Sequence, residues 1–162
     1  MLWQSAEKES PMKLKDKVAL ITGGGRGIGK AIARHYGREG AKLALCARTG
    51  AELDQTIKEL RAMNVDAEGW SCDVSLEEPV KDFVANAHKK FGRIDVLVNN
   101  AGVMTRPSPM IELDVKKWDY TIAVNLRGPF LITQAVLPIM MQQKSGSIIN
   151  AVNSDLSAFK AH

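Results

Sequence analysis

The sequence predicts a doubly wound α/β fold, in which helices cover both faces of a parallel sheet. Short apolar segments rich in β-forming residues alternate with longer segments whose apolar residues recur at helical spacing. Several of the strand segments are apolar without interruption, as expected for strands buried on both faces. Strands separated by helices pair in parallel through right-handed crossovers, so this alternation defines the architecture.

Five strands and five helices are expected, alternating except for two consecutive helices before the last strand. The strands are expected over residues 17–22, 41–47, 65–72, 93–100 and 147–152. The helices are expected over residues 28–40, 50–63, 75–92, 108–125 and 128–144. The strand segments, such as KVALIT at the start and SIINAV at the end, are short and rich in branched apolar residues.

The helices are justified by apolar spacing and by their ends. In the first two, apolar residues recur every three or four positions, and Gly40 follows the first helix as a stop signal. The third begins near Ser75, a candidate N-cap with Glu78 three residues later, as in a capping box. Pro138 is expected to bend or interrupt the fifth helix, because proline removes one helical hydrogen bond.

The chain is expected to form one domain behind a polar segment. Residues 1–12 are interpreted as a polar N-terminal extension, and residues 13–162 as the folded domain. The 162 residues are 45% hydrophobic and 25% charged, a composition typical of soluble globular proteins.

Composition argues against several functional classes. The net charge is +4 with basic residues scattered among acidic ones, so no nucleic-acid partner is expected. No uninterrupted apolar stretch approaches about 18 residues, so no membrane span is expected. Cys46 and Cys72 do not make a disulfide framework, and the three histidines share no ligand spacing. A cytoplasmic protein without a metal site is therefore expected.

The first chemical signal is the glycine-rich sequence TGGGRGIGK at residues 22–30, between the first strand and the first helix. Glycines allow the backbone to approach a phosphate closely, and the helix N-terminus behind them offers free N–H groups. A nucleoside-triphosphatase P-loop is an alternative, because Gly24, Gly29 and Lys30 fit its first part. The next residue should be Ser or Thr but is Ala31, which favours a dinucleotide site.

The residues at the end of the second strand indicate which dinucleotide the site binds. NAD sites usually place an acid there to bind the ribose 2′-hydroxyl, whereas this chain has Ala47 and Arg48. Arg26 lies in the glycine loop as well, and arginines make charge-assisted bonds to phosphate. The pair favours NADP(H), with its 2′-phosphate; the alternative is that both arginines only face solvent.

Four motifs, in order along residues 13–152, resemble those of the short-chain dehydrogenase/reductase family. They are the glycine loop, the sequence CDV at residues 72–74, the sequence NNAG at residues 99–102, and the sequence VNLRGPF from residue 124. The resemblance implies a Rossmann-type sheet and a cofactor site formed by Gly23, Gly25, Arg26, Gly27, Ile28, Gly29, Arg48, Asp73, Val74, Asn100, Ala101 and Gly102.

The resemblance also implies chemistry. In this family a hydride passes between a nicotinamide and a carbonyl or alcohol, and a tyrosine acts as general acid or base. A lysine four residues later lowers the pKa of that tyrosine, an asparagine holds a water of the proton relay, and a serine orients the substrate. A free phenol has a pKa near 10, so it needs such a cation to act near neutrality. The asparagine corresponds to Asn125 here.

The tyrosine and the lysine of this family pattern are not matched in the sequence. Neither Tyr36 nor Tyr120 has a lysine four residues later, so the chain is expected to be an N-terminal portion of such an enzyme, with an incomplete sheet. The serine position falls on Asn153 by direct counting, or on Ser154 if the chain gains one residue locally; Ser154 could also merely cap a turn.

The sequence leaves two hypotheses about function. One is an NADP(H)-dependent oxidoreductase, expected to be a homo-oligomer at full length, and the other is an inactive fragment that at most binds a dinucleotide.

Overall fold

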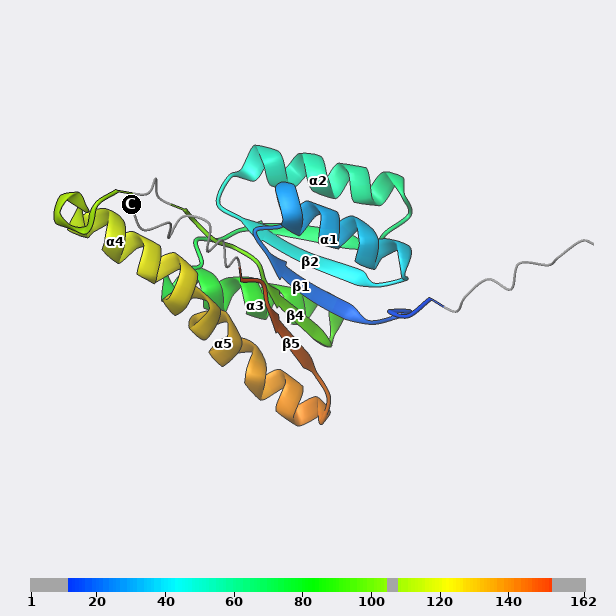
Figure 1. Ribbon diagram of the computed structural model, residues 1–162. Coiled ribbons are helices and arrows are strands. Elements are labelled where there is room, and N and C mark those ends of the chain that lie inside the picture. Colours follow the sequence, from blue (N-terminus) through cyan, green and yellow to red (C-terminus); the bar gives the residue numbers. More distant parts are fainter. Residues whose placement is uncertain (1–11, 105–107, 153–162) are drawn as a thin grey trace, which may run out of the picture.

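The computed structural model describes residues 12–104 and 108–152, which form one α/β unit (Figure 1). Its strands are β1 (Val18–Thr22), β2 (Lys42–Ala47), β3 (Ala67–Ser71), β4 (Val96–Asn99) and β5 (Ser147–Asn150). All pairings are parallel, and the strand order is β3-β2-β1-β4-β5. The predicted doubly wound fold is therefore confirmed. The winding reverses between β1 and β4, which is where ligands bind in open α/β sheets.

Helices cover both faces of the sheet. Helices α1 (Gly27–Arg38) and α2 (Gly50–Ala62) lie on one face, and α3 (Glu77–Phe91) and α5 (Gly128–Gln143) lie on the other (Figure 1). Each face has its own apolar core: Ala33, Leu53 and Leu60 pack on the first, and Phe83 and Ile132 on the second. All five residues of β1 are buried, because this strand is central and covered on both sides.

The start of α3 differs from the prediction, and the expected capping box is wrong. The N-cap residue is Leu76, with no side-chain cap, and α3 begins at Glu77. The Ser75 hydroxyl instead donates to Asp73 Oδ1 at 2.7 Å. Because this acceptor draws the serine back toward the strand, its side chain is not available to the helix.

The helix expected over residues 108–125 is shorter at its start. A 3₁₀ turn, η1 (Met110–Glu112), comes first, and α4 (Val115–Ile122) begins after Asp114, whose carboxylate accepts from the Lys116 N–H at 2.9 Å. A π-helical turn, η2 (Ala123–Arg127), then joins α4 to α5 without a break. Pro138 lies inside α5, which continues to Gln143.

The joined helix Val115–Gln143 is the one helix in the described ranges that is long and apolar enough, by length and composition alone, to cross a membrane. Core helices of soluble proteins satisfy the same criterion. Here Ile132 and Val136 on α5 are fully buried and belong to the core formed with β1, β4 and α3. Packing therefore accounts for part of the apolar character of α5, whereas Phe130 and Met141 on the same helix are exposed.

Candidate functional site

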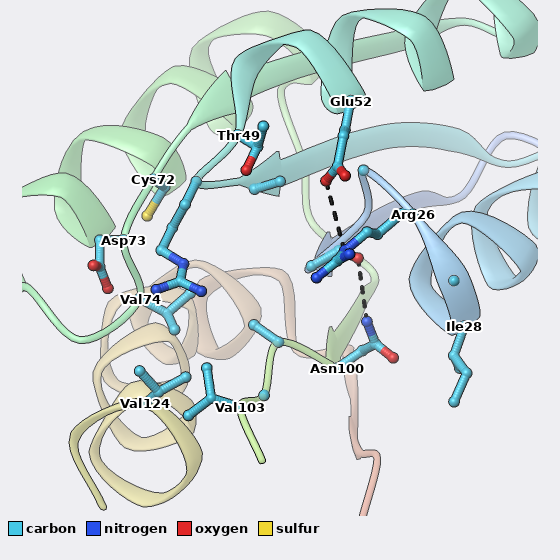
Figure 2. A pocket seen from close by; sticks show the side chains of 17 residues that line it. Arg26, Ile28, Thr49, Glu52, Cys72, Asp73, Val74, Asn100, Val103 and Val124 are labelled. Atoms are coloured by element: carbon cyan, nitrogen blue, oxygen red, sulfur yellow. Dashed lines mark hydrogen bonds and ion pairs between the residues drawn. The ribbon is translucent and has the colours of Figure 1, made fainter. Parts of the chain in front are cut away.

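A cavity of about 620 Å³ lies at the carboxyl ends of β1, β2 and β4, where the winding reverses (Figure 2). It is bounded by the glycine loop after β1, by the chain after β2 and β3, and by the sequence NNAG after β4. Its lining comprises Gly23, Gly25, Arg26, Gly27, Ile28, Ala47, Arg48, Thr49, Glu52, Cys72, Asp73, Val74, Asn100, Ala101, Gly102, Val103 and Val124.

The glycine loop is held close to β4 and needs glycine at two positions in particular. Gly23 has a φ of +67°, a conformation that L side chains rarely adopt. A Cβ on Gly29 would overlap the carbonyl of Gly23 and would lie 2.6 Å from Asn100 Nδ2. The first turn of α1 is thereby packed against the loop, and its free N–H groups can receive a pyrophosphate.

Thr22 connects the two strands that flank the switch point. Its Oγ1 accepts hydrogen bonds from the N–H groups of Asn100 at 3.0 Å and Ala101 at 2.9 Å. Asn100 Nδ2 in turn donates to the carbonyl oxygen of Thr22 at 2.9 Å. Sequence reasoning included Thr22 only as the first letter of the glycine motif and missed this role.

Arg26, Arg48 and Glu52 all line the cavity, but the two arginines have different neighbours. Arg26 Nε lies 3.6 Å from Glu52 Oε2, and Figure 2 shows the carboxylate directed at the guanidinium. The guanidinium carbon of Arg48 lies 5.6 Å from the ring centroid of Tyr120, within cation–π range. Glu52 and Tyr120 were not predicted as site residues. Glu52 could have been noticed, because it is the one acid in the first turn of the helix after β2.

Asp73 and Cys72 follow β3 on the opposite side of the cavity. Asp73 Oδ1 accepts from both the N–H and the hydroxyl of Ser75, at 2.9 and 2.7 Å, which fixes the carboxylate. A hydrogen bond with Cys72, reinforced by burial, raises the pKa of the Cys46 thiol well above its usual value. The same hydrogen bond lowers the pKa of Cys72. Both cysteines are free thiols in this structure.

Asn125 lies in the π-helical turn η2, next to the cavity but not in its lining. Its side-chain amide donates to the Val103 carbonyl oxygen and its Oδ1 accepts from the Val103 N–H, both at 2.8 Å. Single π-helical turns inside α-helices frequently occur at functional sites. Here the turn positions Asn125 to hold the segment that follows NNAG.

The cavity thus brings together the expected cofactor residues, all of which line it except Gly29, which packs beneath the loop. Asn125 lies beside them, and Asn153 and Ser154 fall outside the described residues. Within the described ranges, no group of three or more His, Cys, Asp or Glu side chains could hold a metal ion.

Comparisons with known proteins identify the family. The family model for short chain dehydrogenase matches residues 17–160. The chain is 40% identical over 139 residues to the 3-oxoacyl-(acyl-carrier-protein) reductase FabG of Thermotoga maritima, covering 86% of this chain and 56% of that protein. The chain therefore spans little more than half the length of this relative.

Solved structures agree. A metagenomic short-chain oxidoreductase in complex with NADP matches with a TM-score of 0.81 and 42% identity, over 85% of this chain and 62% of that one. Actinorhodin polyketide ketoreductase with NADPH matches with a TM-score of 0.80 and 40% identity, over 83% and 52%. From the glycine loop, the sheet order and these matches together, the chain belongs to the short-chain dehydrogenase/reductase family, whose members are oxidoreductases that bind a nicotinamide dinucleotide.

Proposed function

We propose that residues 13–162 form an NADP(H)-binding domain, with the cofactor in the cavity of Figure 2. In a protein of the length of its relatives, we propose that this domain serves hydride transfer between NADP(H) and a small carbonyl or alcohol. We further propose that such a protein is a cytoplasmic homo-oligomer without nucleic-acid or membrane partners.

The observation that carries the proposal is that two arginines, from the loops after β1 and β2, line the cavity. Arg26 and Arg48 both line it, and β2 ends at Ala47 rather than at an acid. A phosphate monoester carries about −1.5 to −2 charges near neutrality, so two guanidiniums beside the ribose favour NADP(H) over NAD(H). The two solved structures named above, which contain NADP and NADPH, are in line with this choice.

Asp73 and Val74 would lie beside the adenine, and Asn100, Ala101 and Gly102 beside the remainder of the dinucleotide. Asn125 would act on the nicotinamide side by positioning the chain at Val103. Ser154 would orient the substrate. When bound, the cofactor would supply or accept the hydride, and these residues would hold the cofactor and orient the substrate.

For the 162 residues by themselves we propose dinucleotide binding without turnover. The observation that favours this second candidate is the sequence itself: Gly40 and Val124 stand four residues after the two tyrosines, where the family pattern needs lysine. No proton-transfer pair is therefore present in this chain.

Fluorescence titration of the chain with NADPH and with NADH tests the cofactor assignment. Arg48→Ala should weaken NADPH binding by roughly tenfold to a hundredfold, because a hydrogen bond to a charged group contributes about 1.5–3 kcal/mol, and should change NADH binding much less. Arg38→Ala is the control, since Arg38 is exposed in the last turn of α1, at the end remote from the glycine loop. Equal losses for both cofactors would contradict the 2′-phosphate assignment.

A further inference from the structure

We propose that Glu52 limits the preference of this site for NADP(H), by competing with the 2′-phosphate for the guanidinium of Arg26. The inference rests on the proposed function, because it assumes that a dinucleotide ribose lies beside these arginines. It adds a specificity-determining residue, on α2, to a site otherwise assigned from the glycine loop and the strand ends.

The geometry places Glu52 where such competition can occur. Glu52 lies in the first turn of α2 and lines the same cavity as Arg26 and Arg48. Its Oε2 is 3.6 Å from Arg26 Nε, and this is the only ion pair of Arg26 within residues 12–104 and 108–152. The Arg26 side chain is otherwise open to solvent, with 82% of its surface exposed, so a ligand can reach it.

Charge balance explains the direction of the effect. The Glu52 carboxylate offsets the charge of Arg26, which is one of the two guanidiniums that line the cavity. A bound 2′-phosphate must draw Arg26 away from Glu52 or share it, whereas a ribose 2′-hydroxyl leaves the ion pair intact. The carboxylate therefore weakens the binding of NADPH but not that of NADH. Arg48 is not affected in this way, because it lies against the ring of Tyr120.

A structural role for Glu52 makes a different prediction. An acid in the first turn stabilises a helix through the macrodipole. In that role, the loss of Glu52 would destabilise α2 and weaken the binding of NADPH and NADH equally. In the proposal, Glu52 is a positioning residue that acts on the 2′-phosphate only through Arg26. The ratio of the NADPH and NADH dissociation constants separates this role from stabilisation of α2.

The experiment is a titration of the 162-residue chain and its variants with NADPH and with NADH, followed by fluorescence. Glu52→Gln should tighten NADPH binding roughly threefold to fivefold, the size expected from a partly exposed ion pair, and leave NADH binding unchanged. Glu52→Ala should also tighten NADPH binding, which would show that the effect comes from loss of the carboxylate and not from the amide of the new glutamine. Circular dichroism melts of each variant verify that α2 is retained.

Asp54→Asn is the matched control, because Asp54 lies two residues later on α2 and borders a separate cavity with Arg61 and Glu68. It removes the same charge from the same helix and should change neither dissociation constant. In an Arg26→Ala background, Glu52→Gln should no longer tighten NADPH binding, since the contested guanidinium is gone.

Three results would overturn the inference. They are an unchanged NADPH constant in folded Glu52→Gln, equal changes for both cofactors, and a gain that persists without Arg26. Equal binding of NADH and NADPH by both the wild type and Glu52→Gln would refute the 2′-phosphate proposal, whereas a wild-type chain that binds neither would refute the proposed function as a whole.

Discussion

Gly29 in the first turn of α1 illustrates how the site depends on individual residues. By helix propensity alone, alanine would be about 1 kcal/mol better than glycine in a helix. Yet a Cβ at this position would meet the Gly23 carbonyl and would come within 2.6 Å of Asn100 Nδ2. The close packing of helix on loop outweighs the propensity, because the atoms around this position include rigid backbone as well as an amide already bonded to Thr22.

Gly29→Ala should therefore destabilise the chain by about 1–3 kcal/mol and abolish NADPH binding, since the added methyl group forces the loop away from β4. Thermal unfolding and NADPH titration measure the two effects. Gly50→Ala is the control, because a Cβ there meets nothing within 4 Å at the start of α2. A stabilised Gly29→Ala variant would show that the loop yields easily and that close approach is not required.

At the scale of elements, Asp95 joins three strands at the end of the sheet remote from the cavity. Its Oδ2 accepts from the Val18 N–H at 3.0 Å, and its backbone bonds to Val18 and to Ser147 of β5. Arg93 holds both carboxylate oxygens, at 2.8 and 2.6 Å. Burial raises the pKa of Asp95, but the hydrogen bond from Arg93, then that from Val18, more than offset it, and the pKa is lowered overall.

A lowered pKa means that the folded state favours the charged form of Asp95. Its contribution to stability is thus present above the unfolded value of about 3.9 and is lost as the pH falls through the folded value. Asp95→Asn should lower the stability at pH 7 by about 1–3 kcal/mol, and the difference from wild type should shrink below about pH 4. Urea unfolding at a series of pH values measures this.

Asp82→Asn, on the exposed face of α3, should have almost no effect and serves as the control. A pH-independent loss in Asp95→Asn would mean that shape, rather than charge, holds the strands together at this edge.

At the scale of the whole molecule, α4 and α5 present large apolar side chains to solvent. Trp118 is 51% exposed, Phe130 59% and Met141 72%. Exposed apolar patches of this kind mark interaction surfaces or promote aggregation. We therefore expect the 162-residue chain to form oligomers or aggregates, which light scattering coupled to size-exclusion chromatography measures. A sharp monomeric peak with a cooperative melt would contradict this expectation.

The isolated chain should also show no detectable oxidoreductase activity, even when NADPH binds. General acid catalysis typically contributes about 10²–10⁴-fold, and this chain has no tyrosine–lysine pair to supply it. The measurement is the NADPH absorbance with ketones, β-ketoacyl thioesters and sugar alcohols as substrates. Turnover above the uncatalysed rate that disappears in Asn125→Ala would show that another residue provides the proton.

The sequence by itself determined the alternation of strands and helices, the place of the glycine loop and the residue types expected at the cofactor. These follow from local patterns, because apolar periodicity and glycine spacing reflect each segment's own burial and backbone. The same locality explains the errors. Ser75, expected to cap α3, donates its hydroxyl hydrogen bond to Asp73 instead. The helix expected to end before Gly128 continues through a π-helical turn into α5.

Only the tertiary structure decided which side chains meet. The order β3-β2-β1-β4-β5 brings the loop after β1 beside the turn after β4, so Thr22 and Asn100 bond across 78 positions of sequence. The pairing of Arg26 with Glu52, and the hold of Asn125 on Val103, likewise join segments whose spacing carries no signal. A side chain's partner is set by how helices pack on the sheet, and that packing depends on the whole chain rather than on the residues near the site.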